Sequence, residues 1–163
     1  KTANATATTA SFNIAVLKTG LYIDMACFQP VGYVRHSYSD EEVKKRRFVD
    51  GVLEVLPEFE AALAGVEEFS HLIVVSYLHK FRERPLVVRP RRVPGAPEVG
   101  VFATDSPDRP NPIGVSIVRL VKREGRLLYI RGVDLFDGTP VLDIKGFSPS
   151  RCPGEVKTPW WID

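Results

Sequence analysis

Short segments rich in β-branched and aromatic residues recur along the chain, each bounded by residues that favour turns. They span residues 28–34, 71–79, 86–89, 99–103, 115–121, 127–133 and 140–144. Many short strands at such spacing are typical of an antiparallel barrel or of a twisted sheet that closes on itself. The sequence lacks the long amphipathic helices that alternate with strands in a Rossmann domain. We therefore expect a mainly β protein, a small antiparallel β-barrel with one or two short helices.

Helix and turn signals fill the intervals between these segments. Ser39 and the three acidic residues after it have the chemistry of a helix start, and residues 57–64 resemble a short helix. Residues 123–126 form a turn between two predicted strands. Asp137 and Gly138 indicate a hairpin because both tolerate positive φ angles. The strand that follows them is therefore expected to pair back.

Length and composition suit a single globular domain. A chain of 163 residues can bury one core but is short for two full domains. We expect residues 25–163 to form that domain and residues 1–24 to be an N-terminal extension, in which the apolar residues 12–23 are a candidate interface strand. No apolar run approaches the roughly 20 residues that span a bilayer, so no membrane association is expected.

Two further observations bear on the compartment. The first residues lack the basic start and apolar core of a secretory signal. Cys27 and Cys152 alone do not make a disulfide framework. A cytoplasmic protein is the expectation.

The formal net charge of only +2 does not by itself indicate nucleic-acid binding, but the basic residues are clustered. One cluster comprises Lys44, Lys45, Arg46 and Arg47, and a second comprises Arg82, Arg84, Arg89, Arg91 and Arg92. Patches of this kind can follow phosphates, although they are more often simply solvated surface. Charge alone leaves both interpretations open.

Missing motifs exclude several kinds of chemistry. The chain has no glycine-rich dinucleotide loop, no P-loop and no nucleophile elbow. A metal site is not expected, because His71 and His79 would lie about 26 Å apart on a strand that rises roughly 3.3 Å per residue. The remaining histidine, His36, and the two cysteines offer no zinc spacing.

The most unusual stretch is VGVFATDSPDRPNPIG, residues 99–114. Three prolines within six residues fix φ and remove backbone donors, so the loop is stiff. A stiff loop after a strand can hold Arg109 and Asn111 in fixed directions with little ordering cost on binding. The same prolines are also compatible with a crossover that only shapes the barrel.

This stretch resembles the signature of the TsaA-like (TrmO) family, V-G-V-F-A-T-R-S-P-x-R-P-N-P-I-G. Further blocks that resemble the family follow its order: PVGYVR at 30–35, GVEEFSHL at 65–72 with Leu78-His79, and DLFDGTPVLDIK at 134–145. Together these blocks span residues 30–145. The compact C-terminus resembles the shorter archaeal-type members.

The resemblance implies a fold and an activity. Family members are β-barrel methyltransferases without a Rossmann fold, work as dimers and bind S-adenosyl-L-methionine in a cleft. Their described activity is methylation of N6 of the threonylcarbamoyl-modified adenosine at position 37 of tRNA. For this chain the resemblance implies a homodimer with tRNA as substrate, and a TsaA-like domain over residues 25–163.

Chemistry assigns roles to three of the matching residues. Asn111 can orient an adenine edge, and Asp137 could accept a proton or a hydrogen bond. Both are candidate catalytic residues, although Asp137 also fits the role of a hairpin-turn aspartate. Arg109 suits a phosphate or the threonyl carboxylate of the substrate through bidentate pairing. Its alternative role is to brace the loop through an internal ion pair.

The family pattern also implies a set of contacts to the cofactor. They fall on Arg47, Phe48, Val49, Leu78, His79, Asp105 and Val115. An aromatic ring at Phe48 can stack on adenine. A last cofactor segment is expected beyond Lys145, near residues 153–154.

Two departures from the family pattern leave alternatives open. Asp105 stands where members usually have arginine, which replaces a cation by an anion. Gly146 and Phe147 stand where proline and tyrosine are common. An active methyltransferase is the leading hypothesis. A module that binds S-adenosylmethionine or a nucleotide without turnover is the second, and an RNA-binding barrel with no small-molecule site is the third.

Overall fold

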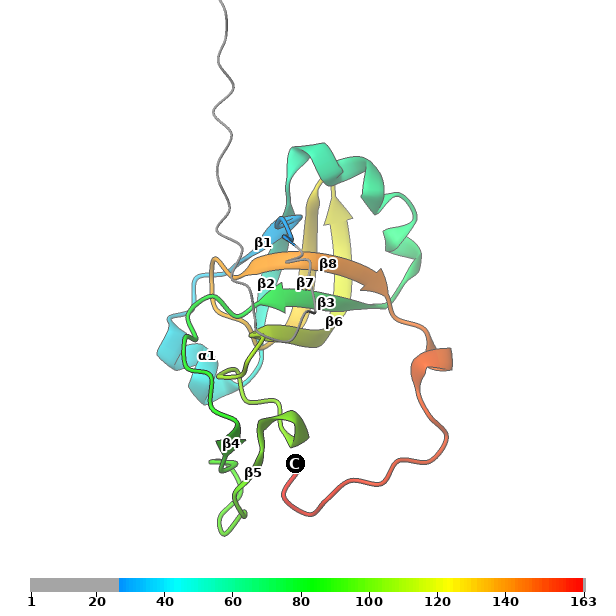
Figure 1. Ribbon diagram of the computed structural model, residues 1–163. Coiled ribbons are helices and arrows are strands. Elements are labelled where there is room, and N and C mark those ends of the chain that lie inside the picture. The colour runs from blue at the N-terminus through cyan, green and yellow to red at the C-terminus, as the bar shows by residue number, and fades with distance from the viewer. Residues whose placement is uncertain (1–26, 163) are drawn as a thin grey trace, which may run out of the picture.

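The computed structural model describes residues 27–162, and within them six strands form a closed antiparallel barrel (Figure 1). The order around the barrel is β1-β2-β7-β6-β3-β8. The strands are β1 (Gly32–Arg35), β2 (Val49–Val55), β3 (His71–Tyr77), β6 (Ile113–Glu124), β7 (Leu127–Val133) and β8 (Pro140–Gly146). The predicted mainly β barrel is confirmed. The predicted extension, residues 1–24, lies outside the described residues.

The remaining elements are short and lie outside the barrel wall. They are α1 (Asp40–Arg46), β4 (Val87–Val88), β5 (Val99–Gly100) and the 3₁₀ helices η1 (Pro57–Leu63), η2 (Val66–Glu68), η3 (Val101–Ala103) and η4 (Pro149–Arg151). β4 and β5 pair only with each other and hang below the barrel in Figure 1. Within residues 27–162, no helix has the length and apolar character needed to cross a membrane.

The predicted helix start is confirmed at α1. The Ser39 hydroxyl accepts a hydrogen bond from the backbone N–H of Glu42 at 3.3 Å, and the Glu42 carboxylate accepts one from the backbone N–H of Ser39 at 2.9 Å. This reciprocal capping box satisfies two backbone donors that a helix start otherwise leaves open. Residues 57–64 form the 3₁₀ helix η1 rather than an α-helix.

Alternation of inward and outward residues builds the core. On β3, Leu72, Val74 and Ser76 are fully buried, while the residues between them are partly exposed. β6 alternates in the same way over most of its length. Successive side chains of a strand point to opposite faces, so a closed barrel collects one set inside.

One strand was missed, and the expected pairing of another was wrong. β2 was not predicted, because Asp50 and Gly51 near its start are residue types that are uncommon in strands. β8 does not pair back onto β7 but pairs with β1 and β3. The chain between β7 and β8 instead crosses one end of the barrel, where Val34 N–H donates to Thr139 O and Gly138 N–H donates to Val34 O.

Several predicted strand limits also shift. The first strand begins at Gly32 rather than at residue 28, and the segment at 99–103 is a strand only over β5 before it turns into η3. There Thr104 N–H donates to Val101 O, which closes a 3₁₀ turn and ends the strand. β6 is longer than predicted, because its outward-facing residues are partly apolar and partly charged and so do not mark the ends of the strand.

Gly32 allows β1 and β2 to approach closely. A Cβ atom at this position would lie 2.5 Å from Glu54 O and 3.0 Å from Val55 Cα. Both are backbone atoms of the paired strand, so the contact can be relieved only by moving the ladder. Glycine is required here for space.

We predict that Gly32→Ala lowers the free energy of unfolding by about 1–3 kcal/mol, the usual cost of overpacking. Gly100→Ala is the matched control, because a Cβ there meets no atom within 4 Å and the φ angle of −59° is ordinary. Urea denaturation of the three proteins measures the difference. Equal stability of the two variants would show that the β1–β2 approach is not sterically limited.

Candidate functional site

The end of β3 and the start of β6 meet at one end of the barrel. Leu78 N–H donates to Pro112 O at 2.7 Å, and Gly114 lies opposite Ser76 in the ladder. A Cβ at Gly114 would lie 2.7 Å from Ser76 Oγ and 2.9 Å from Leu78 Cδ2. The side chains of Ser76 and Leu78 therefore fill the space that this glycine leaves.

Buried polar atoms at this end lack hydrogen-bond partners within the described part of the chain. They are Ser76 Oγ and His79 Nδ1, and a third such atom, His36 Nδ1, lies beside the connection that carries Leu135 and Asp137. A buried polar atom without a partner is costly, and such atoms are concentrated where a ligand or water completes the site. Burial, and secondarily the charge of Lys80, holds the pKa of His79 below its usual value. Asp40 acts weakly in the opposite direction.

A second segment reaches the same end through β2 and β7. Val49 pairs with Val133, so Phe48 and Asp134 lie beside the last pair of this ladder. Asp134 Oδ1 accepts a hydrogen bond from Ser116 Oγ at 2.5 Å. Ser116 is buried on the inner face of β6, two residues after Gly114. This bond joins the β7 end to the β3–β6 end.

The backbone before β2 is strained. Arg47 follows α1 with a φ of 71°, the one positive φ of a non-glycine residue among residues 27–162. Such conformations cost energy and persist where the surroundings fix them. The Arg47 guanidinium lies 5.5 Å from the centre of the Phe48 ring, and that ring is 54% exposed. An aromatic face is thus held open to solvent at this end.

Helix α1 is tied to the same region by charge and ring contacts. Lys80 Nζ lies 2.7 Å from the Asp40 carboxylate, and the Phe81 and Phe136 rings stack with centroids 5.7 Å apart. Lys44 and Lys80 lie 5.9 and 5.1 Å from the centre of the Phe136 ring. Residues 79–81, α1 and residues 134–137 therefore form one contiguous surface.

The predicted catalytic residues have separate local partners. Asp137 Oδ1 accepts a hydrogen bond from the backbone N–H of His36 at 2.9 Å, which agrees with a role in the turn. The exposed Asn111 accepts a bond from Ile113 N–H through its backbone carbonyl. In the described structure Asn111 and Asp137 share no hydrogen bond.

The proline-rich loop is braced from within. Arg109 Nη1 donates to Thr104 O at 3.0 Å and to Ser106 O at 3.5 Å. The alternative role of Arg109, bracing the loop, is thus present, but the contacts are to backbone carbonyls and not to an acidic side chain. Asp105 is exposed in the same loop.

The remaining predicted contacts divide by the face on which they lie. Leu78 and Val49 pack inward, whereas the side chain of Val115 points outward and is 68% exposed. Residues 153–154, expected as a last cofactor segment, lie in an exposed stretch after η4. Ser116, Asp134 and Phe136 were not predicted as site residues. A serine at an inward position of an alternating strand was the available signal for Ser116.

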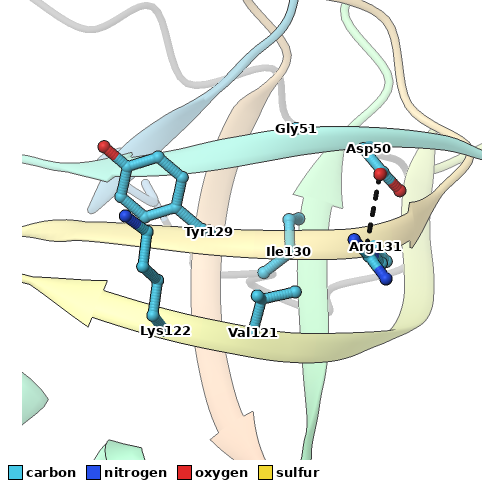
Figure 2. Close-up of a pocket in the computed structure, with 7 residues that line it drawn as sticks. All are labelled: Asp50, Gly51, Val121, Lys122, Tyr129, Ile130 and Arg131. Carbon is cyan, nitrogen blue, oxygen red and sulfur yellow. Dashed lines mark ion pairs between the residues drawn. The ribbon is translucent and has the colours of Figure 1, made fainter.

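A shallow hollow lies elsewhere, on the outer wall of β2, β7 and β6 (Figure 2). Its lining residues are Asp50, Gly51, Val121, Lys122, Tyr129, Ile130 and Arg131. Arg131 pairs with Asp50 at 3.4 Å across it, and Lys122 lies 4.3 Å from the centre of the Tyr129 ring. None of the predicted site residues lines this hollow, so we place the candidate site at the barrel end. No group of three metal-ligating side chains occurs among the described residues.

Comparison with known proteins assigns the family. The family described as the tRNA-methyltransferase O N-terminal domain matches residues 41–151. The chain belongs to the TrmO family. The predicted resemblance is thus confirmed, and the match covers α1 from Glu41 onward, the barrel end and the proline-rich loop.

Relatives of this TrmO-family chain include archaeal and bacterial proteins. A probable S-adenosyl-L-methionine-binding protein of Pyrococcus abyssi is 42% identical, over 85% of this chain and 77% of its own length. The Escherichia coli tRNA (adenine(37)-N6)-methyltransferase is 38% identical, over 75% of this chain and 57% of its own. The crystal structure of TrmO from Pseudomonas aeruginosa superposes with a TM-score of 0.66 at 32% identity, covering 85% of this chain and 62% of that one. The chain thus spans only somewhat more than half of the bacterial proteins.

Because the pKa of His79 is lowered in the folded protein, the free energy of unfolding is expected to fall as the pH falls. An unfolded histidine titrates near 6.5 and the folded one lower, so the unfolded chain binds protons more readily as pH falls through that range. Stability from this group is complete above pH 6.5 and is lost below it. We predict that wild type loses unfolding free energy relative to His79→Gln between about pH 7.5 and about pH 5.

Urea denaturation of both proteins at the two pH values measures this difference. Both proteins keep the other two histidines, so the comparison isolates the change at residue 79. Parallel pH profiles for wild type and His79→Gln would contradict the buried, neutral state of this imidazole.

Proposed function

We propose that this chain is an S-adenosylmethionine-dependent methyltransferase that methylates N6 of threonylcarbamoyl-adenosine at position 37 of tRNA. The main support is that four strand termini meet at one end of the barrel: the starts of β2 and β6 and the ends of β3 and β7. The family match and a relative named as a tRNA (adenine(37)-N6)-methyltransferase support the reaction and the substrate.

The residues at the barrel end fit S-adenosylmethionine as cofactor, in agreement with relatives described as binding it. The Asp134 carboxylate, fixed by Ser116, suits ribose hydroxyls or the cofactor's amino group as an acceptor. The exposed Phe48 ring suits adenine stacking, and the partnerless His79 Nδ1 suits a polar cofactor atom. When bound, the cofactor supplies a methyl group from its sulfonium.

The chain's contribution to the reaction is positioning and proton acceptance. Methyl transfer to an amine is an in-line displacement, so alignment of the nucleophile supplies much of the rate. Asn111 orients the adenine edge, and the proton that N6 loses passes to a carboxylate, which we assign to Asp137. The His36 N–H bond to Asp137 fixes the direction of that carboxylate.

Arg109 binds the anionic part of the substrate in this proposal. Its Nη1 atom braces the loop, and a guanidinium has further N–H donors for a phosphate or the threonyl carboxylate. Leu78, Val49, Arg47, Asp105 and Val115 complete the proposed cofactor contacts.

We further propose that the protein is a cytoplasmic homodimer. Support comes from four outward apolar residues along β6, each at least 42% exposed: Ile113, Val115, Ile117 and Val121. An apolar row of this kind is typical of an interaction surface. Sedimentation equilibrium is expected to give a dimer, and a monomer at all concentrations would exclude it.

The reaction is tested with purified protein, S-adenosylmethionine and tRNA that carries or lacks the threonylcarbamoyl group. We predict methylated nucleoside only from the modified tRNA, detected by mass spectrometry after digestion. Asp137→Asn is expected to lower kcat by about 10²–10⁴-fold, the range of general acid–base contributions. Asn111→Ala is expected to lower kcat as well, because the adenine edge is then no longer oriented. Absence of product from a folded protein that binds the cofactor would exclude the enzyme.

Asp105 favours a second candidate, a binding module without turnover, because an anion stands where the family usually has a cation. Asp105→Arg separates the two possibilities. If wild type binds S-adenosylmethionine in calorimetry without turnover and Asp105→Arg methylates tRNA, the binding module is the native function. Turnover by wild type excludes it.

A further inference from the structure

Residues 82–100 form an arm that leaves the barrel between the end of β3 and the start of β6. The arm contains β4 and β5, and it projects away from the barrel in Figure 1. Its base is closed where Leu78 N–H donates to Pro112 O, and Val101 N–H donates to Leu86 O at 2.9 Å. The arm therefore begins next to His79, at the barrel end that holds the candidate site.

The arm concentrates the positive charge of the molecule. It holds five arginines and two glutamates, a net charge of +3, whereas the whole chain carries +2. Arg91 and Arg92 are exposed and have no ion pair within the described part of the chain. Arg89 lies 3.7 Å from Glu98, with both side chains more than 60% exposed. A pair this exposed adds little stability, so Arg89, Arg91 and Arg92 are not explained by folding.

The arm is stiff for a segment with so little regular structure. Pro85, Pro90, Pro94 and Pro97 fix φ at four positions. Ala96 N–H donates to Val93 O at 3.1 Å, and Ala96 is buried at this turn. A stiff segment loses little conformational entropy when it binds a partner.

Exposed apolar side chains flank the arginines. Leu86 and Val87 are 72% and 57% exposed, and Phe102 beside the arm is 79% exposed. Cations beside an open aromatic ring are the combination that binds single-stranded RNA, because arginine contacts phosphate while the ring stacks on a base.

We propose that the arm binds the sugar–phosphate backbone of the RNA beside the target adenosine, an inference that rests on tRNA being the substrate. Because the arm starts at the barrel end, the phosphates that it binds are those near the reacting base. The anticodon stem-loop alone therefore contains the contacts, and distant parts of the tRNA add nothing to the arm's share of the affinity.

The test uses the full chain with Arg91→Ala and Arg92→Ala combined. Binding of labelled tRNA and of its anticodon stem-loop is followed by fluorescence anisotropy at several salt concentrations. Loss of two single-strand phosphate contacts is expected to make the slope of log affinity against log salt shallower by about 1.4. The affinity ratio of wild type to the arm variant therefore falls about sevenfold when the salt concentration rises fourfold. The effect is expected to be the same for both RNAs.

Arg119→Ala with Arg131→Ala is the matched control, because it removes two exposed cations from the outer barrel wall. Its RNA affinity is expected to stay above that of the arm variant. Equal loss in both variants would overturn the inference, since general charge would then explain the binding. An unchanged salt slope in the arm variant, or a change only in its oligomeric state, would overturn it as well.

Methylation and S-adenosylmethionine binding are measured in the same samples. Arm-dependent RNA binding without methylation by wild type would remove the proposed enzyme and leave the arm's role standing. If wild type methylates tRNA and the arm variant binds RNA as tightly as wild type, the proposed enzyme stands and the proposed role of the arm is excluded. Unchanged S-adenosylmethionine affinity in the arm variant shows that it remains folded.

Discussion

The hydrogen-bond ladder of β8 closes the barrel, and the candidate site depends on that closure. Val141 pairs with Gly32 of β1 and with Ser76 of β3, so one fully buried residue joins both edges of the sheet. Without this strand β1 and β3 would be free edges, which expose unpaired backbone groups. The connection from β7 to β8 must therefore cross the end of the barrel, where it carries Asp134, Phe136 and Asp137.

The polar groups at this end differ from the rest of the interior. Most of the barrel is filled with valine, leucine and isoleucine, but Ser76, Ser116 and Thr139 are buried near the site. Ser116 is satisfied by Asp134, whereas Ser76 Oγ and His79 Nδ1 lack partners in the described structure. Buried polar groups reduce stability unless they are paired, so their concentration at one end is explained best by a ligand that completes them.

Much of the fold follows from local sequence, while the site does not. The capping box at Ser39 and the strand β7 depend on neighbouring residues and were predicted directly. The strands that pair with β8 were not predicted, because alternation specifies which face a residue occupies but not which strand lies beside it. The Ser116–Asp134 bond joins residues 18 apart and exists only because β6 and β7 share one wall. His79 was named as a candidate site residue from the family resemblance, and only the structure shows that its Nδ1 atom is buried.

Four strand termini meet at this barrel end, and we propose that they form one cofactor site. Nuclear magnetic resonance of isotopically labelled protein, titrated with S-adenosylmethionine, tests it directly. Shifts are predicted for the amides of residues 47–49, 78–79, 114–116 and 134–137, together with the His79 ring. Shifts confined to the outer hollow around Tyr129 and Arg131, or scattered without saturation, would contradict the account.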